Sequence, residues 1–91
     1  MSIKVRIPTQ LRTLTGGAGE VTVEGSTVGE VLKSLDAAHA GFADRLFDDA
    51  GELRRFVNVF VADEDVRFLD GLATPVTEGQ TLSIVPAVAG G

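Results

Sequence analysis

The residues best suited to chemistry stand at the carboxyl end, where an uncharged run is followed by Gly90 and Gly91. Neither glycine carries a Cβ, so the active site of another protein could close around this backbone and reach the final carboxylate without meeting a side chain. Small residues at a terminus are also common where the terminus has no function. The pattern indicates that the carboxylate of Gly91 is a candidate reactive group.

Few other residues suit conventional catalysis. His39 is the single histidine, and the absence of cysteine removes disulfides, thiolate metal sites and a cysteine nucleophile. The spacing predicts that His39 lies near the end of a helix, where the helix dipole favours a cation. None of the serines has the sequence context of a nucleophile elbow. We therefore expect a protein that is not an enzyme and that binds no metal or cofactor itself.

Length and charge set further limits. The chain has 91 residues, of which 44% are hydrophobic and 23% charged, as is typical of one ordinary globular domain. Its formal net charge of -5 disfavours nucleic acid, because an acidic surface repels phosphates. We see neither a signal-peptide apolar region nor an apolar run that could cross a bilayer. These features predict a cytoplasmic protein without nucleic-acid or membrane partners.

The first half of the chain predicts a hairpin followed by a helix. Apolar and polar residues alternate over 3–7 and 20–24, which is typical of two strands, and the glycine-rich stretch between them favours a long turn. Thr27 and Glu30 have the spacing of a capping box. The apolar stripe that follows predicts a helix over 28–39, with one face on the sheet.

The strongest strand signal covers 56–61, where alternation puts three valines on one face and Phe56, Asn58 and Phe60 on the other. Asn58 indicates that the second face is the more open one, because a buried amide would need partners for its donors and its acceptor. The two phenylalanines would then form an exposed apolar patch. The alternative is that a loop covers them.

The last third predicts an acidic turn at 62–65, a short edge strand at 66–68 and a final strand over 80–85 that Pro86 ends. Two hairpin strands, one helix and further strands make an α+β domain, with a mixed sheet packed on one main helix.

Several segments together resemble the ThiS/MoaD sulfur-carrier family, and its actinobacterial members most closely. These segments are Ile3–Pro8, Thr15–Gly17, Arg55–Val59, Asp63–Phe68, Gly71–Thr74 and Leu82–Gly91. The resemblance spans essentially the whole chain and implies a ubiquitin-like β-grasp fold. It divides the chain into a β-grasp domain at 1–86 and a flexible tail at 87–91. The turn Glu78-Gly79-Gln80-Thr81 departs from a more acidic version in many family members.

The resemblance also implies a chemistry for Gly91. A ubiquitin-activating-type adenylyltransferase would use ATP to adenylate its carboxylate, and sulfur would then replace AMP to give a thiocarboxylate. Activation is needed because a carboxylate is anionic at pH 7 and resists nucleophiles. The implied recipient is a pyridoxal-phosphate-dependent synthase of cysteine, with a metal-dependent peptidase releasing the product, or a thiosugar synthase. Thiamine and molybdopterin pathways could use the same carrier.

Partner recognition is expected to involve two surfaces. The tail residues Ala87, Val88, Ala89 and Gly90 would thread into the activating enzyme, since a segment of this length spans roughly 17 Å when extended. A preformed docking face on the sheet would be provided by Phe56, Phe60 and Val85. Because this surface is already folded, it loses less conformational entropy on binding than the tail does.

Two other functions use the same features. A ubiquitin-like modifier would be joined through Gly91 to lysines of other proteins, because the activated carboxyl is common to both uses. A plain binding module would have a tail without chemistry. We expect a monomer, since a carrier must leave one enzyme and visit another.

Overall fold

The computed structural model describes residues 2–54 and 57–86. Its strands are β1 (Ser2–Arg6), β2 (Glu20–Glu24), β3 (Val57–Val61), β4 (Glu64–Asp65) and β5 (Thr81–Pro86). Its helices are α1 (Val28–Ala38) and α2 (Phe42–Leu46), with the 3-10 turns η1 (Thr9–Thr15), η2 (Val66–Phe68) and η3 (Gly71–Ala73).

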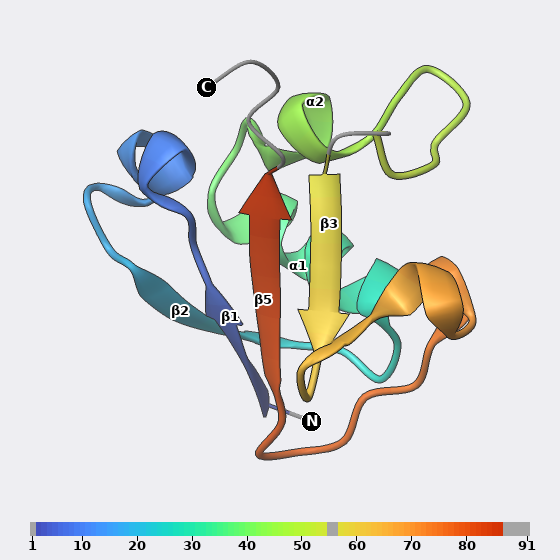
Figure 1. Cartoon of the computed structure of the whole chain (residues 1–91). Coiled ribbons are helices and arrows are strands. Elements are labelled where there is room, and N and C mark those ends of the chain that lie inside the picture. The colour runs from blue at the N-terminus through green and yellow to red at the C-terminus, as the bar shows by residue number, and fades with distance from the viewer. Residues whose placement is uncertain (1, 55–56, 87–91) are drawn as a thin grey trace.

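The five strands form one mixed sheet in the order β2-β1-β5-β3-β4. β5 lies in the middle, parallel to β1 and antiparallel to β3, and β1 pairs with β2 as the predicted antiparallel hairpin. α1 crosses one face of the sheet, and the opposite face is open toward the viewer in Figure 1. This two-layer arrangement confirms the α+β class and the ubiquitin-like β-grasp implied by the resemblance.

α1 begins where the capping signal predicts. The Thr27 hydroxyl accepts a hydrogen bond of 3.2 Å from the Glu30 backbone N–H, and a carboxylate oxygen of Glu30 accepts one of 3.0 Å from the backbone N–H of Ser26. The return bond therefore reaches one residue earlier than in a standard capping box. The predicted apolar stripe is buried against the sheet; its members are Val28, Val31, Leu32 and Leu35.

Strand alternation places the core as predicted. Val57, Val59 and Val61 of β3 are buried, whereas Asn58 and Phe60 are half-buried on the other face. In β5, Leu82 and Ile84 are buried while Val85 is exposed. Each large aliphatic side chain taken fully out of water contributes roughly 1.5–3 kcal/mol, so these strand faces and α1 carry most of the stabilisation.

The long connection between β1 and β2 contains η1, which the sequence pattern did not predict. Two local predictions were wrong. The predicted turn at 62–65 is shorter, because β4 begins at Glu64. The segment 66–68 is a 3-10 turn and not an edge strand. Alternation would have put Val66 and Phe68 on one face, but the turn buries Val66 and leaves Phe68 exposed. Among the described residues, no helix has the length and apolar character needed to cross a membrane.

Candidate functional site

β5 determines where the carboxyl-terminal segment leaves the domain. Its register with β3 runs from Leu82 opposite Val61 to Pro86 opposite Val57, and β1 pairs with its other side over 81–83. Hydrogen bonds from two neighbours hold a central strand more firmly than one neighbour holds an edge strand. The first half of β5 is therefore held on both sides, and Pro86 lies opposite Val57 at the end of the sheet.

Most of the predicted site residues lie outside the described part of the chain. They are Gly91, the tail residues Ala87, Val88, Ala89 and Gly90, and Phe56 of the predicted docking face. Their roles stay predictions. The other two members of the docking face, Phe60 and Val85, are described and can be placed.

Phe60 and Val85 lie on the same open face of the sheet. Phe60 is opposite Ser83 in the antiparallel register, so Val85, two residues further along β5, is its diagonal neighbour. Val85 has 45% of its surface exposed, and Phe60 is half-buried. The structure therefore brings the two apolar side chains together beside the strand end that carries the tail.

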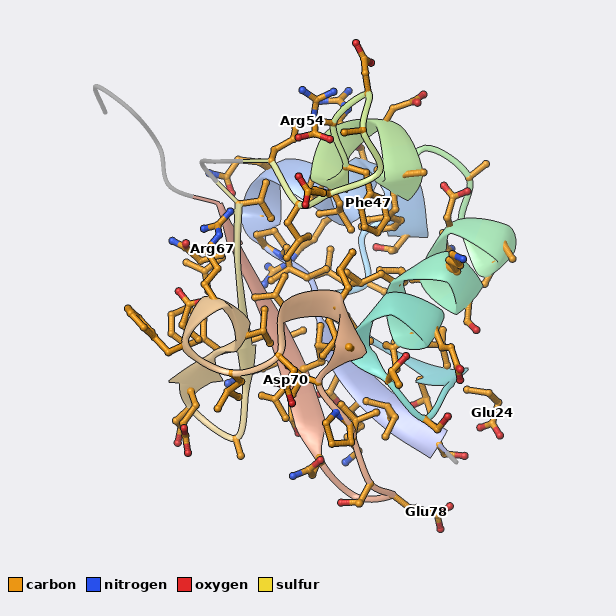
Figure 2. All side chains as sticks on the ribbon, turned by 90° about the vertical axis from the view of Figure 1, so that its right-hand side faces the viewer. Glu24, Phe47, Arg54, Arg67, Asp70 and Glu78 are labelled. Atoms are coloured by element: carbon orange, nitrogen blue, oxygen red, sulfur yellow. The ribbon has the colours of Figure 1, made fainter. Side chains whose placement is uncertain are left out.

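Arg67 reaches this face from η2, which the sequence did not reveal. Its Nη1 donates a hydrogen bond of 2.8 Å to Oδ1 of Asn58, and its Nη2 donates one of 2.6 Å to the carbonyl oxygen of Arg54. Asn58 is the cross-strand partner of Val85. In Figure 2, Arg67 lies on the left, which is the side of the open sheet face. The guanidinium thus ties the start of β3 to η2 beside the apolar pair.

The local turn explains how Arg67 is held there. The Asp65 carboxylate accepts a hydrogen bond of 2.9 Å from the Arg67 backbone N–H and so caps η2. The buried Val66 side chain fixes the turn from the other side. A sequence reader could have noted the Asp-x-Arg spacing as a turn signal, but only the tertiary fold shows that the guanidinium meets Asn58.

The open face carries cations although the chain is acidic. Lys4 and Arg6 of β1 point to this face, and Arg6 is the register partner of Ser83. Together with Arg67 they form the basic part of a mixed rim, because Asp65 is the register partner of Phe60 and Glu20 is that of Arg6. An apolar centre with a charged rim is the usual anatomy of a protein interface.

Glu20 and Glu24 of β2 lie on the same face, opposite Arg6 and Ser2. The Ser2 hydroxyl donates a hydrogen bond of 2.7 Å to Glu24, and this bond lowers the pKa of Glu24 below its ordinary value of 4.5. Glu24 therefore stays ionised at neutral pH, at the edge of the sheet away from β3.

His39 lies at the end of α1, as predicted, where its backbone N–H donates to the Leu35 carbonyl oxygen. The Ser26 hydroxyl donates to the Glu30 carboxylate and so takes part in the cap of α1. Within residues 2–54 and 57–86, no group of three or more His, Asp or Glu side chains could hold a metal ion. The described body shows an apolar pair, Phe60 and Val85, on the open face and a central strand that ends at Pro86.

Comparison with known proteins agrees with this arrangement. The ThiS family model matches residues 5–91. Sulfur carrier protein CysO of Mycobacterium tuberculosis is 50% identical over 93 aligned residues, which cover 100% of both proteins. Small archaeal modifier protein 3 of Haloferax volcanii is 47% identical over 66 residues, covering 72% of this chain and 71% of that protein.

A solved structure is similar to this chain in both fold and sequence. A chain in the crystal structure of the Amycolatopsis orientalis BexX/CysO complex superposes with a TM-score of 0.92 and 50% identity, covering 98% of this chain and 99% of that one. A family match over nearly the whole sequence, a full-length sulfur-carrier relative and a matching fold agree with one another. The chain belongs to the ThiS family and is a homologue of the sulfur carrier CysO.

Proposed function

We propose that this protein carries sulfur on the carboxyl group of Gly91. The observation that carries the proposal is the full-length likeness to CysO, which is named a sulfur carrier protein. The pairing of Pro86 with Val57 supports it, because the sheet then extends to the residue directly before the proposed tail. The protein would be a cosubstrate whose reactions occur in the active sites of partner enzymes.

The first reaction would be adenylation. A carboxylate oxygen of Gly91 attacks the α-phosphorus of ATP and pyrophosphate leaves, which gives an acyl adenylate. An adenylyltransferase of the ubiquitin-activating type would hold the ATP. The carbonyl carbon then has a good leaving group, whereas the free carboxylate had none.

The second reaction would replace AMP by sulfur. A sulfide-level sulfur attacks the carbonyl carbon, a carbon–sulfur bond forms, and the carbon–oxygen bond to AMP breaks. The product is a thiocarboxylate, which is ionised at neutral pH and presents a nucleophilic sulfur. Because the chain contains no cysteine, no thiol of its own can capture the activated carbonyl.

The body would supply the affinity for the activating enzyme. Phe60 and Val85 form the apolar centre of the docking face, and Lys4, Arg6 and Arg67 form its rim. Threading a tail costs ordering entropy, so a preformed face reduces what the tail must contribute. We expect the enzyme surface opposite this face to be apolar at its centre and to carry carboxylates where it meets Lys4, Arg6 and Arg67.

The likeness to CysO supports cysteine synthesis as the destination of the sulfur. A pyridoxal-phosphate-dependent synthase would accept it, and a metal-dependent peptidase would release cysteine from the carrier. A thiosugar synthase is the alternative acceptor. The BexX/CysO complex is a precedent for a relative of this chain assembled with another protein.

Intact mass spectrometry tests the proposal directly. After incubation with ATP, a cognate adenylyltransferase and sulfide, the mass should rise by about 16 Da, the difference between sulfur and oxygen in the acyl group. A chain that lacks Gly91 is the control, and it should fold normally without gaining mass. An unchanged mass of the full chain with an enzyme that activates another family member would overturn the proposal.

Conjugation to other proteins is the second candidate, favoured by the 47% identity to a protein named small archaeal modifier protein 3. It would use the same acyl adenylate, with a lysine amine as the nucleophile. Arg67 is the last trypsin site in the chain, so a conjugated lysine would carry residues 68–91 as a branch after digestion. Such branched peptides, resistant to reducing agents and absent with a Gly91 deletion, would support it. Their absence from cells in which the thiocarboxylate accumulates would leave sulfur transfer as the function.

A further inference from the structure

Two large apolar side chains project into solvent at the β4 edge of the sheet. Phe68 at the end of η2 has 86% of its surface exposed, and Leu69 has 41% exposed. An isolated exposed apolar residue needs no explanation, but an almost fully exposed phenylalanine beside an exposed leucine indicates an interaction surface.

The structure holds Phe68 outward. Val66 of the same turn is fully buried, and the Leu69 backbone N–H donates to the Val66 carbonyl oxygen at 2.9 Å. On the other side, Arg67 is bound to Asn58. Since neighbours on both sides are fixed, Phe68 cannot turn into the core without breaking these contacts.

Phe68 and Leu69 border a groove of about 460 Å³, which also includes Val61, Glu64, Asp70 and Pro75 in its lining. Its far wall is the segment before β5, and that wall is fixed by Thr74. The hydroxyl of the buried Thr74 accepts a hydrogen bond of 3.0 Å from the Asp70 backbone N–H. The Thr74 carbonyl oxygen accepts one of 3.0 Å from the Val28 backbone N–H. The groove is therefore preformed, with walls from η2 and from a segment tied to α1.

The charge of the groove selects its occupant. Glu64 and Asp70 contribute carboxylates, and none of the residues lining the groove is Lys, Arg or His. Figure 2 shows Asp70 at this edge, while Arg67 is directed to the open sheet face. An acidic apolar groove repels anionic lipid and nucleic acid and complements a cationic apolar segment.

We propose that this Phe68 groove binds a segment of a partner protein that inserts one aliphatic or aromatic side chain flanked by Lys or Arg. The groove lies near the beginning of β5, and Pro86 lies at its other end, about 17 Å away at about 3.3 Å per residue. A partner seated here would lie at the β4 edge and not on the open face. The proposal does not rest on the chemistry proposed for Gly91.

The test is a titration of the isotope-labelled full chain, followed by NMR, with a short capped peptide in which one phenylalanine is flanked by lysines. Two control peptides replace the phenylalanine by alanine or the lysines by glutamates. Saturable shifts should concentrate at residues 61–70, 74, 75 and 80, and both controls should bind at least about tenfold more weakly, as expected for a buried aromatic anchor with charged neighbours.

Variants of the protein make the test specific. Phe68→Ala should weaken binding at least about tenfold, and the fold should survive because the side chain is exposed. Val85→Ala is the matched control, since Val85 is also exposed but lies on the open face, and it should bind the peptide like the natural chain. Equal binding of the alanine peptide, undiminished binding by Phe68→Ala, or shifts centred elsewhere would overturn the proposal, as would a failure to bind. The same titration with the Gly91 deletion should give the same result.

Discussion

Arg67 donates a hydrogen bond of 2.8 Å to Asn58 across the open face, and Asn58 is the strand partner of Val85. The same guanidinium donates to the Arg54 carbonyl oxygen, just before β3. One side chain from η2 therefore holds the beginning of β3 at the end of the sheet where β5 stops.

Replacing Arg67 should loosen this end of the sheet. We expect Arg67→Ala to lower the free energy of unfolding by about 1 kcal/mol, because two exposed charge-assisted hydrogen bonds are lost. Arg67→Lys should recover only part of this, since an ammonium cannot reproduce the forked geometry. Urea denaturation measures both, with the exposed Arg45→Ala as the control. If Arg67→Ala unfolds at the same urea concentration as the natural chain, the hydrogen bonds of Arg67 to Asn58 and Arg54 contribute no stability.

Charge placed at Val85 should impair activation through weaker docking. We expect Val85→Asp to raise the KM for the carrier in the adenylation reaction at least about tenfold, with a much smaller change in kcat, because the face binds the enzyme before the chemical step. Thr77→Asp adds the same charge at an exposed position beyond the opposite end of β5 and should leave KM unchanged. An unaltered KM for a folded Val85→Asp would remove this face from the interface.

A side chain on the penultimate residue should block access to the enzyme. We expect Gly90→Val to reduce kcat/KM for adenylation at least about tenfold, because the branched Cβ widens the segment that must thread the site. Thermal unfolding should be unchanged, which separates this effect from instability. Gly90→Ala is the graded control, and its kcat/KM should lie between those of the natural chain and Gly90→Val. Full activity of Gly90→Val would show that the enzyme does not enclose the terminus closely.

The cap of α1 should make stability depend on pH. The backbone N–H and the hydroxyl of Ser26 bind the Glu30 carboxylate and lower its pKa below the ordinary value of 4.5. A lowered folded-state pKa stabilises the fold above the unfolded-state value, and this contribution disappears as pH falls through the lowered value. Glu30→Gln should therefore unfold more easily than the natural chain at neutral pH, and the difference should shrink in acid.

Urea denaturation at several pH values measures this difference. Ser26→Ala removes one of the two donors and should reduce the pH-dependent part without abolishing it. A constant difference between Glu30→Gln and the natural chain down to about pH 3 would contradict the proposed linkage.

Most of the regular structure could be predicted because its signals are local. Alternating residues defined β1, β2, β3 and β5, and the Thr27 cap with its apolar stripe defined α1. The same alternation placed Phe60 and Val85 on one face. Such patterns succeed where each element has one buried side.

The missed features depend on contacts between distant segments. Arg67 meets Asn58 only because η2 folds back along β3, and the outward position of Phe68 follows from the burial of Val66 in a 3-10 turn. The sequence 66–68 suits a strand equally well when read alone. The groove beside it requires Pro75 to return next to η2, which no local pattern indicates.

The central place of β5 also makes the whole sheet depend on a strand that comes late in the sequence. β1 on one side of β5 and β3 on the other both need it for pairing. A chain interrupted before residue 81 leaves β1 and β3 with no common neighbour, so it cannot complete the sheet. Chains truncated before residue 81 should thus lose cooperative unfolding and be sensitive to proteases, whereas a chain truncated after Pro86 should keep both strand pairings of β5.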